Sequence, residues 1–83
     1  MATREEVYAQ LRSILIIDFS VTPEKIGEEA TFRGQMGLDS LDTVDLIYLL
    51  KKTFRLENVR THDFRDLHTM RQVVDFLVAH GKE

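Results

Sequence analysis

Apolar side chains recur at intervals of three and four residues in three segments of this chain, and no segment alternates apolar and polar residues over a useful length. That spacing places apolar side chains on one face of an α-helix. It predicts helices over about 3–18, 40–55 and 69–80. Two of these starts, 3–6 and 69–72, have the spacing of a capping box, in which side chains satisfy free N–H groups of the first turn. The sequence therefore predicts an all-α domain.

The connection between the first two predicted helices is long. It covers 19–39 and contains the only proline and three of the four glycines. Within it, Thr22 and Pro23 have the arrangement of a cap and a first helical residue, which predicts a single helical turn. Loops longer than about 12–15 residues are uncommon in compact domains unless they are functional or disordered. Apolar residues along this loop predict that it packs onto the core: Phe19, Val21, Ile26, Phe32 and Met36.

A short fourth helix is expected around 62–66, with Thr61 as its cap. The predicted fold is a small four-helix bundle of three main helices and one short helix, with the long loop between the first and second helices. Because 83 residues are too few for two domains, we expect one domain over 1–83. A domain of this size buries only roughly 60% of the surface of its unfolded chain, so function is expected on the surface and not in a deep catalytic cleft.

Composition excludes several functional classes. The 11 basic and 14 acidic residues give a net charge of −3, which argues against nucleic acid as the main partner. Without cysteine the chain has no disulfide and no thiolate nucleophile, and its three histidines lack metal-ligand spacing. No apolar run approaches the roughly 20 residues that span a bilayer, and no secretory leader is recognisable at the start. We expect a monomeric cytoplasmic protein without metal and without membrane insertion.

The second predicted helix has two apolar faces. At 100° per residue, one stripe is expected in the core, with Leu46 at its margin. That stripe consists of Val44, Ile47, Leu50 and Phe54. A neighbouring face carries Leu41, Asp45, Tyr48 and Lys52. On this face Leu41 and Tyr48 are either half-buried at the edge of the core or the centre of a docking surface bordered by charge.

The segment at the start of this helix is Gly37-Leu38-Asp39-Ser40-Leu41-Asp42. Asp39 or Ser40 caps the helix, and Asp42 lies in the first turn, where the helix dipole favours a negative charge. A serine hydroxyl exposed at this end could carry a phosphodiester, whose charge the free N–H groups would help to accommodate. Gly37 would let the backbone of another protein approach.

The run from Met36 to Leu46 resembles the attachment motif of acyl carrier proteins, small acidic four-helix domains that carry acyl groups as thioesters on 4′-phosphopantetheine. The resemblance covers nearly the whole chain, including Thr22-Pro23-Glu24 in the loop, Phe54 at the end of the second helix and Asp75-Phe76-Leu77 near the end. It implies a non-catalytic carrier. It also implies that Ser40 is the attachment site of 4′-phosphopantetheine, which comes from coenzyme A.

The same resemblance implies roles for neighbouring residues. Those that flank the attachment site and take part in its recognition are Gly37, Leu38, Asp39, Leu41 and Asp42. Asp45 and Tyr48 fall on the helix that the family presents to its partner enzymes, and Lys52, which helical spacing places on the same face, is expected to take part in docking as well. The partners would be a phosphopantetheinyl transferase and acyl-loading and acyl-using enzymes of the ligase, ketosynthase and acyltransferase types, in fatty-acid, specialised lipid or polyketide biosynthesis. In this family the acyl chain can fold back between the helices, with the short helix at 62–66 as the gate.

The charge pattern departs from that of common fatty-acid carriers, which stay acidic at the end of the second helix. Here 35–50 contains three acidic residues and no basic one, whereas 51–72 contains six basic residues and three acidic ones, starting with Lys51 and Lys52. A basic patch on a partner would be repelled near Lys52. We therefore expect a dedicated set of partners in a specialised lipid or polyketide pathway.

Two alternatives remain at the level of the sequence. Peptidyl carriers are similar in fold, but Gly37-Leu38-Asp39 favours the acyl branch. A non-carrier helical interaction domain would instead dock through Leu41 and Tyr48. Such a domain would tolerate loss of the Ser40 hydroxyl, and a carrier would not.

Overall fold

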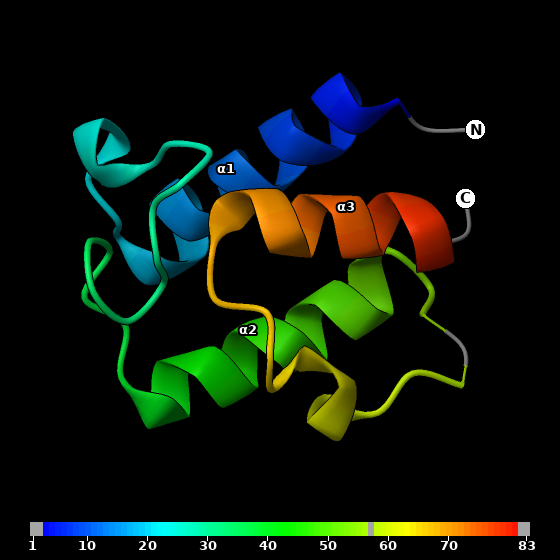
Figure 1. Cartoon of the computed structure of the whole chain (residues 1–83). Coiled ribbons are helices and arrows are strands. Elements are labelled where there is room, and N and C mark those ends of the chain that lie inside the picture. Colours follow the sequence, from blue (N-terminus) through cyan, green and yellow to red (C-terminus); the bar gives the residue numbers. More distant parts are fainter. Residues whose placement is uncertain (1–2, 57, 82–83) are drawn as a thin grey trace.

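A computed structural model describes residues 3–56 and 58–81, and over these ranges the fold is all-α. The main elements are helices α1 (Arg4–Phe19), α2 (Ser40–Thr53) and α3 (Met70–His80), and the connections contain two short 3₁₀ turns, η1 (Pro23–Lys25) and η2 (Thr61–Phe64). In Figure 1, α1 and α3 lie side by side, and η2 lies against α2. The predicted architecture is confirmed. Among the described residues, no helix combines the length and the apolar character that crossing a membrane requires.

Local hydrogen bonds define the predicted helix starts. The Thr3 hydroxyl accepts from Glu6 N–H at 3.1 Å, and Glu6 Oε1 accepts from Thr3 N–H at 3.0 Å. Thr69 and Gln72 form the same reciprocal pair at the start of α3. These boxes satisfy N–H groups that the first turn leaves without a partner. α2 ends at Thr53, short of the predicted end at residue 55, because the backbone enters the left-handed region at Arg55, with φ 52°.

η2 differs from the short helix expected at 62–66. It begins at Thr61 and ends at Phe64. Thr61 is not its cap, because Arg60 occupies that position. The Asp63 carboxylate accepts from Arg60 N–H at 2.9 Å. The start of η2 is therefore stabilised by the Asp63 carboxylate and not by the predicted cap, the Thr61 hydroxyl.

α2 is rotated relative to the predicted core stripe. Val44, expected in the core, is 54% exposed, whereas Leu46, expected at the margin, is 4% exposed. The rest of the stripe is buried as predicted: Ile47, Leu50 and Phe54. The reason is tertiary, since Phe32 of the loop and Phe64 of η2 face the same space as Leu46 and cover that side of α2. Val44 therefore belongs to the exposed face of the helix.

Backbone hydrogen bonds connect the long loop to the start of α3. Three backbone hydrogen bonds of 2.9–3.2 Å make this connection: Phe32 N–H to His68 O, Met70 N–H to Ala30 O and Arg71 N–H to Glu28 O. The apolar residues of the loop also contact the core as predicted. Val21, Phe32 and Met36 are buried, and Phe19 and Ile26 are partly buried against the core. The loop thus has a defined position beside α2.

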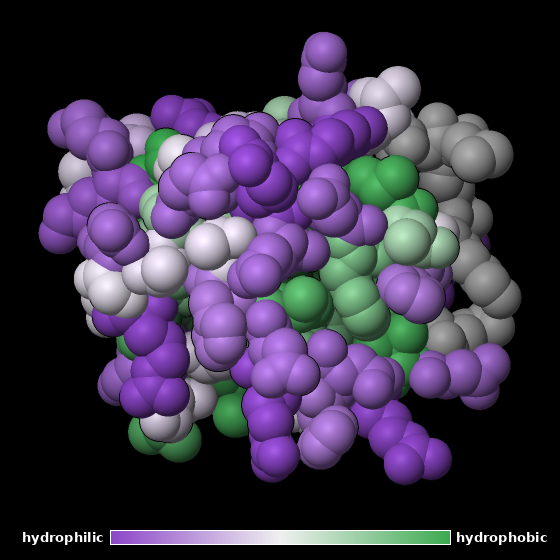
Figure 2. All heavy atoms as spheres, in the orientation of Figure 1, coloured by the Kyte–Doolittle hydropathy of each residue, from purple (hydrophilic) through white to green (hydrophobic). Residues whose placement is uncertain are grey.

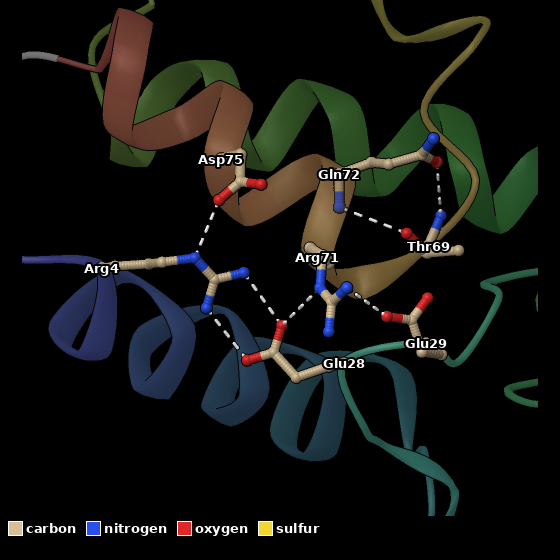
Figure 3. A network of polar contacts seen from close by, with 7 residues as sticks. All are labelled: Arg4, Glu28, Glu29, Thr69, Arg71, Gln72 and Asp75. Atoms are coloured by element: carbon tan, nitrogen blue, oxygen red, sulfur yellow. Dashed lines mark hydrogen bonds and ion pairs between the residues drawn. The ribbon is translucent and has the colours of Figure 1, made fainter.

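Charged side chains add to this fastening (Figure 3). Arg4 on α1 donates two hydrogen bonds to the Glu28 carboxylate, both of 2.9 Å, and its Nε donates to Asp75 Oδ1 on α3 at 2.8 Å. Arg71 Nη1 lies 2.6 Å from Glu29 Oε2. The hydrogen bond from Arg4 is the main cause that lowers the pKa of Glu28. These contacts link α1, the loop and α3.

Candidate attachment site

Ser40 is the first residue of α2, and it is exposed. The cap of the helix is Asp39: its Oδ1 accepts from Asp42 N–H at 2.9 Å, and Asp42 Oδ2 accepts from Asp39 N–H at 3.4 Å. Of the two caps that the sequence allowed, the structure selects Asp39. The Ser40 hydroxyl is therefore not needed to close the helix. It lies on the surface at the positive end of the helix dipole.

Gly37 and Leu38 lead the chain to Ser40. Gly37 has φ 73°, in the left-handed region that other L residues rarely adopt. No heavy atom lies within 4 Å of the position that a Cβ would take, so backbone conformation and not crowding requires glycine here. Leu38 is buried, and its N–H donates to Phe32 O at 2.9 Å. Leu38 thus anchors the segment to the core, and the space around Gly37 is open to a partner.

α2 presents an apolar face next to Ser40. Leu41, Val44 and Tyr48 are 76%, 54% and 69% exposed. Leu41 and Tyr48 are therefore not half-buried at the edge of the core, and the interpretation of this face as a docking surface stays a prediction. Asp45 and Lys52 are exposed on the same helix, as the spacing predicted. In Figure 2, hydrophobic atoms reach the surface at the lower left, beside the start of α2, among hydrophilic atoms.

A cavity of about 840 Å³ lies between α2, η2 and the long loop. Its apolar lining includes Phe32, Leu46, Ile47, Leu50, Phe64 and Leu67. This volume is within the range of about 300–1,000 Å³ that is usual for small-molecule sites. The sequence indicated only the wall at η2, because the other walls come from the loop, α2 and α3, which the tertiary fold brings together.

No metal cluster accompanies Ser40 in the part of the chain that the structure describes, where no three His, Asp or Glu side chains are placed to hold an ion. The histidines are surface residues. His62 and His68 are exposed, and the ring of His80 lies against Phe76 with centroids 4.4 Å apart.

The surroundings of Ser40 fit a prosthetic group attached through a phosphodiester. The hydroxyl is exposed, the first-turn N–H groups and the helix dipole favour a negative charge, and the open space at Gly37 leaves room for the arm. Asp39 and Asp42 add negative charge nearby, but both carboxylates accept backbone hydrogen bonds within the cap.

Sequence comparison places most of the chain in a known family. Residues 9–77 match the protein family described as the phosphopantetheine attachment site. The chain is 32% identical over 76 residues to an acyl carrier protein of Bdellovibrio bacteriovorus, a match that covers 92% of this chain and 96% of that protein. It is 34% identical over 74 residues to an acyl carrier protein of Thermosynechococcus vestitus, with 89% and 90% covered.

The match excludes a helical interaction domain that is not a carrier. The prosthetic group of the family is 4′-phosphopantetheine. The chain belongs to the phosphopantetheine attachment family, as a non-catalytic carrier similar to acyl carrier proteins.

Proposed function

We propose that Ser40 carries the 4′-phosphopantetheine arm, and that 1–83 is a single carrier domain that presents acyl intermediates to enzymes of fatty-acid, specialised lipid or polyketide biosynthesis. The observation that carries the proposal is the exposed Ser40 hydroxyl, which the cap between Asp39 and Asp42 leaves free at the start of α2. A phosphopantetheinyl transferase can reach this hydroxyl without any part of the fold opening.

Each residue of the motif has a part in this function. The first turn of α2 stabilises the negative charge of the phosphodiester by about 0.3–1 kcal/mol. Gly37 and Leu38 position the backbone, and Asp39, Leu41 and Asp42 form the surface that the transferase recognises. When bound, the arm supplies the terminal thiol that this cysteine-free chain lacks and that holds an acyl group as a thioester. Tethering replaces free diffusion of the cargo by a local encounter with each partner.

Partner enzymes dock on the exposed face of α2. Leu41, Val44 and Tyr48 supply its apolar contacts, and Asp45 and Lys52 orient the partner through charge. Because Lys51 and Lys52 follow the acidic start of the helix, we propose that the partners form a dedicated set in a specialised lipid or polyketide pathway. A ketosynthase of housekeeping fatty-acid synthesis should then turn over the Lys51→Glu/Lys52→Glu variant faster than the wild type. Equal turnover of the two would contradict a restricted set of partners.

An acyl cargo is favoured over an aminoacyl cargo. Gly37-Leu38-Asp39 is the acyl-type motif, the two relatives are named acyl carrier proteins, and the cavity beside α2 has an apolar lining. Loading by an amino-acid-activating enzyme, with no loading by an acyl-activating one, would favour the peptidyl type instead.

The decisive experiment is intact-mass spectrometry after incubation with a promiscuous phosphopantetheinyl transferase and coenzyme A. We expect one phosphopantetheine to be added to the wild type and none to Ser40→Ala. Ser13→Ala is the matched control, since Ser13 is an exposed serine on α1, and it should be modified like the wild type. Modification of Ser40→Ala would place the attachment site elsewhere, and no modification of any protein would overturn the proposal.

A further inference from the structure

We infer that the cavity beside α2 accepts an acyl chain that carries an anionic group, a carboxylate, in addition to its apolar part. This inference rests on the proposed attachment at Ser40, which would bring the cargo to the cavity. Two observations support it: the sign of the charged residues that line the cavity, and the ion pairs of the charged residues elsewhere in the described structure.

The lining of the cavity is asymmetric in charge. Besides its apolar wall it includes Arg33 from the long loop and His62, Arg65 and His68 from η2 and the turn that follows. It includes no aspartate and no glutamate, although the whole chain has more acidic than basic residues. A surface that is merely solvated carries both signs interspersed. The charged side chains of the cavity lining are therefore basic, and the rest of the lining is mainly apolar.

The segment 61–68 shows most clearly that basic side chains line the cavity and acidic ones do not. It contains two aspartates, Asp63 and Asp66, yet only its basic and apolar members and Thr61 line the cavity. Asp63 faces the start of η2, where its carboxylate accepts from Arg60 N–H at 2.9 Å. The segment 61–68 thus directs its basic side chains to the cavity, and a carboxylate of its 3₁₀ turn holds the backbone at the start of that turn.

Arg33 and Arg65 make no ion pair with any other described residue, whereas Arg4 and Arg71 are paired with Glu28, Glu29 and Asp75 (Figure 3). These two guanidinium groups come from different walls, the loop and the turn after η2. A carboxylate that enters the cavity can accept charge-assisted hydrogen bonds from them, a geometry that arginine favours. The alkyl part of the same cargo would contact Leu46, Phe64 and their apolar neighbours.

The phosphodiester of the arm is a second possible source of negative charge. It would be fixed at Ser40, whereas α2 lines the cavity only from Thr43 onward. This placement favours an anion that arrives with the cargo. The two sources can be separated, because the arm is present in the unloaded holo-protein and the cargo is not.

The test compares two cargoes of equal chain length, octanoyl and suberoyl, transferred from their coenzyme A thioesters to Ser40 by a promiscuous phosphopantetheinyl transferase. We measure thioester cleavage by hydroxylamine, normalised to the same thioesters free in solution. The suberoyl thioester should be cleaved about threefold more slowly than the octanoyl one, a factor within the range for exposed ion pairs. This protection should shrink at high salt.

The variant Arg33→Gln/Arg65→Gln should remove this protection and keep the melting temperature of the octanoyl-loaded protein. Arg12→Gln is the matched control, because Arg12 is exposed on α1 and does not line the cavity, and it should keep the protection. Equal normalised rates for the two cargoes on the wild type would overturn the inference and leave Ser40 as the site, since intact mass records the loading. So would protection that survives the double substitution.

Two further outcomes are distinguishable. If neither cargo loads onto the wild type, the attachment at Ser40 fails first. If the double substitution lowers the melting temperature of the unloaded holo-protein as much as that of the suberoyl-loaded protein, the arginines serve the phosphodiester of the arm, and the inference about the cargo is wrong.

Discussion

At the scale of single residues, Asp39 combines two roles that substitution can separate. Its carboxylate closes the cap of α2 by accepting from Asp42 N–H at 2.9 Å, and it places a negative charge beside Ser40. Asparagine caps a helix as well as aspartate, and alanine does not. Asp39→Ala should therefore lower the free energy of unfolding by about 1 kcal/mol, and Asp39→Asn should leave it nearly unchanged, in urea denaturation. The rate of phosphopantetheine transfer to Asp39→Asn then reports the charge alone. Equal stability of the two variants would contradict the cap.

Gly37 offers a second test at this scale, because its φ of 73° is the whole reason for glycine. Gly37→Ala meets no atom but must adopt the left-handed region, so the free energy of unfolding should fall by about 1–2 kcal/mol. Gly27→Ala is the matched control: its Cβ also meets nothing within 4 Å, and the backbone there is outside that region. It should be neutral or slightly stabilising in the same denaturation experiment. Similar losses in both variants would show that the conformation of Gly37 carries no strain for alanine.

At the scale of helices, what could be predicted from the sequence is what depends on nearby residues. The capping boxes at Thr3 and Thr69 join residues three positions apart, so the sequence pattern alone is enough to predict them. The exposure of Val44 could not be predicted from helical spacing. Which face of α2 is buried depends on Phe32 of the loop and Phe64 of η2, which pack on the side of Leu46. The same holds for the pair between Arg4 and Asp75, which are 71 positions apart.

The rotation of α2 can be tested with two truncations on the same helix. Leu46 is 4% exposed, so Leu46→Ala should lower the free energy of unfolding by about 2–3 kcal/mol. Val44 is 54% exposed, and Val44→Ala should change it by less than about 0.5 kcal/mol. Urea denaturation of both variants checks the difference. A larger loss for Val44→Ala than for Leu46→Ala would restore the stripe that helical spacing alone predicts.

At the scale of the whole molecule, a chain of contacts runs from the start of α3 to the proposed attachment site at Ser40. The N–H of Phe32 donates to His68 O beside the start of α3, the N–H of Leu38 donates to Phe32 O, and Ser40 follows. The motif around Ser40 could be recognised from sequence because it is contiguous. The basic lining of the cavity could not be recognised in this way, because Arg33 and Arg65 come from separate segments that the tertiary fold brings together. The position of Ser40 thus depends on the hydrogen bonds that connect the long loop to the start of α3.

The ion pairs that contribute to this fastening predict how stability depends on pH. The hydrogen bond from Arg4 lowers the pKa of Glu28 below its usual 4.5. Because the folded protein binds this proton more weakly than the unfolded chain, the stabilisation is complete above the unfolded pKa and is lost as the pH falls through the folded one. The free energy of unfolding should therefore decrease as the pH falls from about 5 to about 3, and Glu28→Gln should make the decrease shallower.

Two companion variants serve as controls for this prediction. Arg4→Gln should also flatten the acid limb of the stability curve, because it removes the main cause of the lowered pKa of Glu28. The double variant should add little to either single one, since both act on the same pair. Part of the decrease should persist in all variants, because hydrogen bonds with Thr3 also lower the pKa of Glu6. If Glu28→Gln loses stability in parallel with the wild type throughout a pH series of urea denaturations, the pair with Arg4 does not couple folding to protonation. The loop is then held to α1 and α3 by its backbone hydrogen bonds, its apolar contacts and the pair between Arg71 and Glu29.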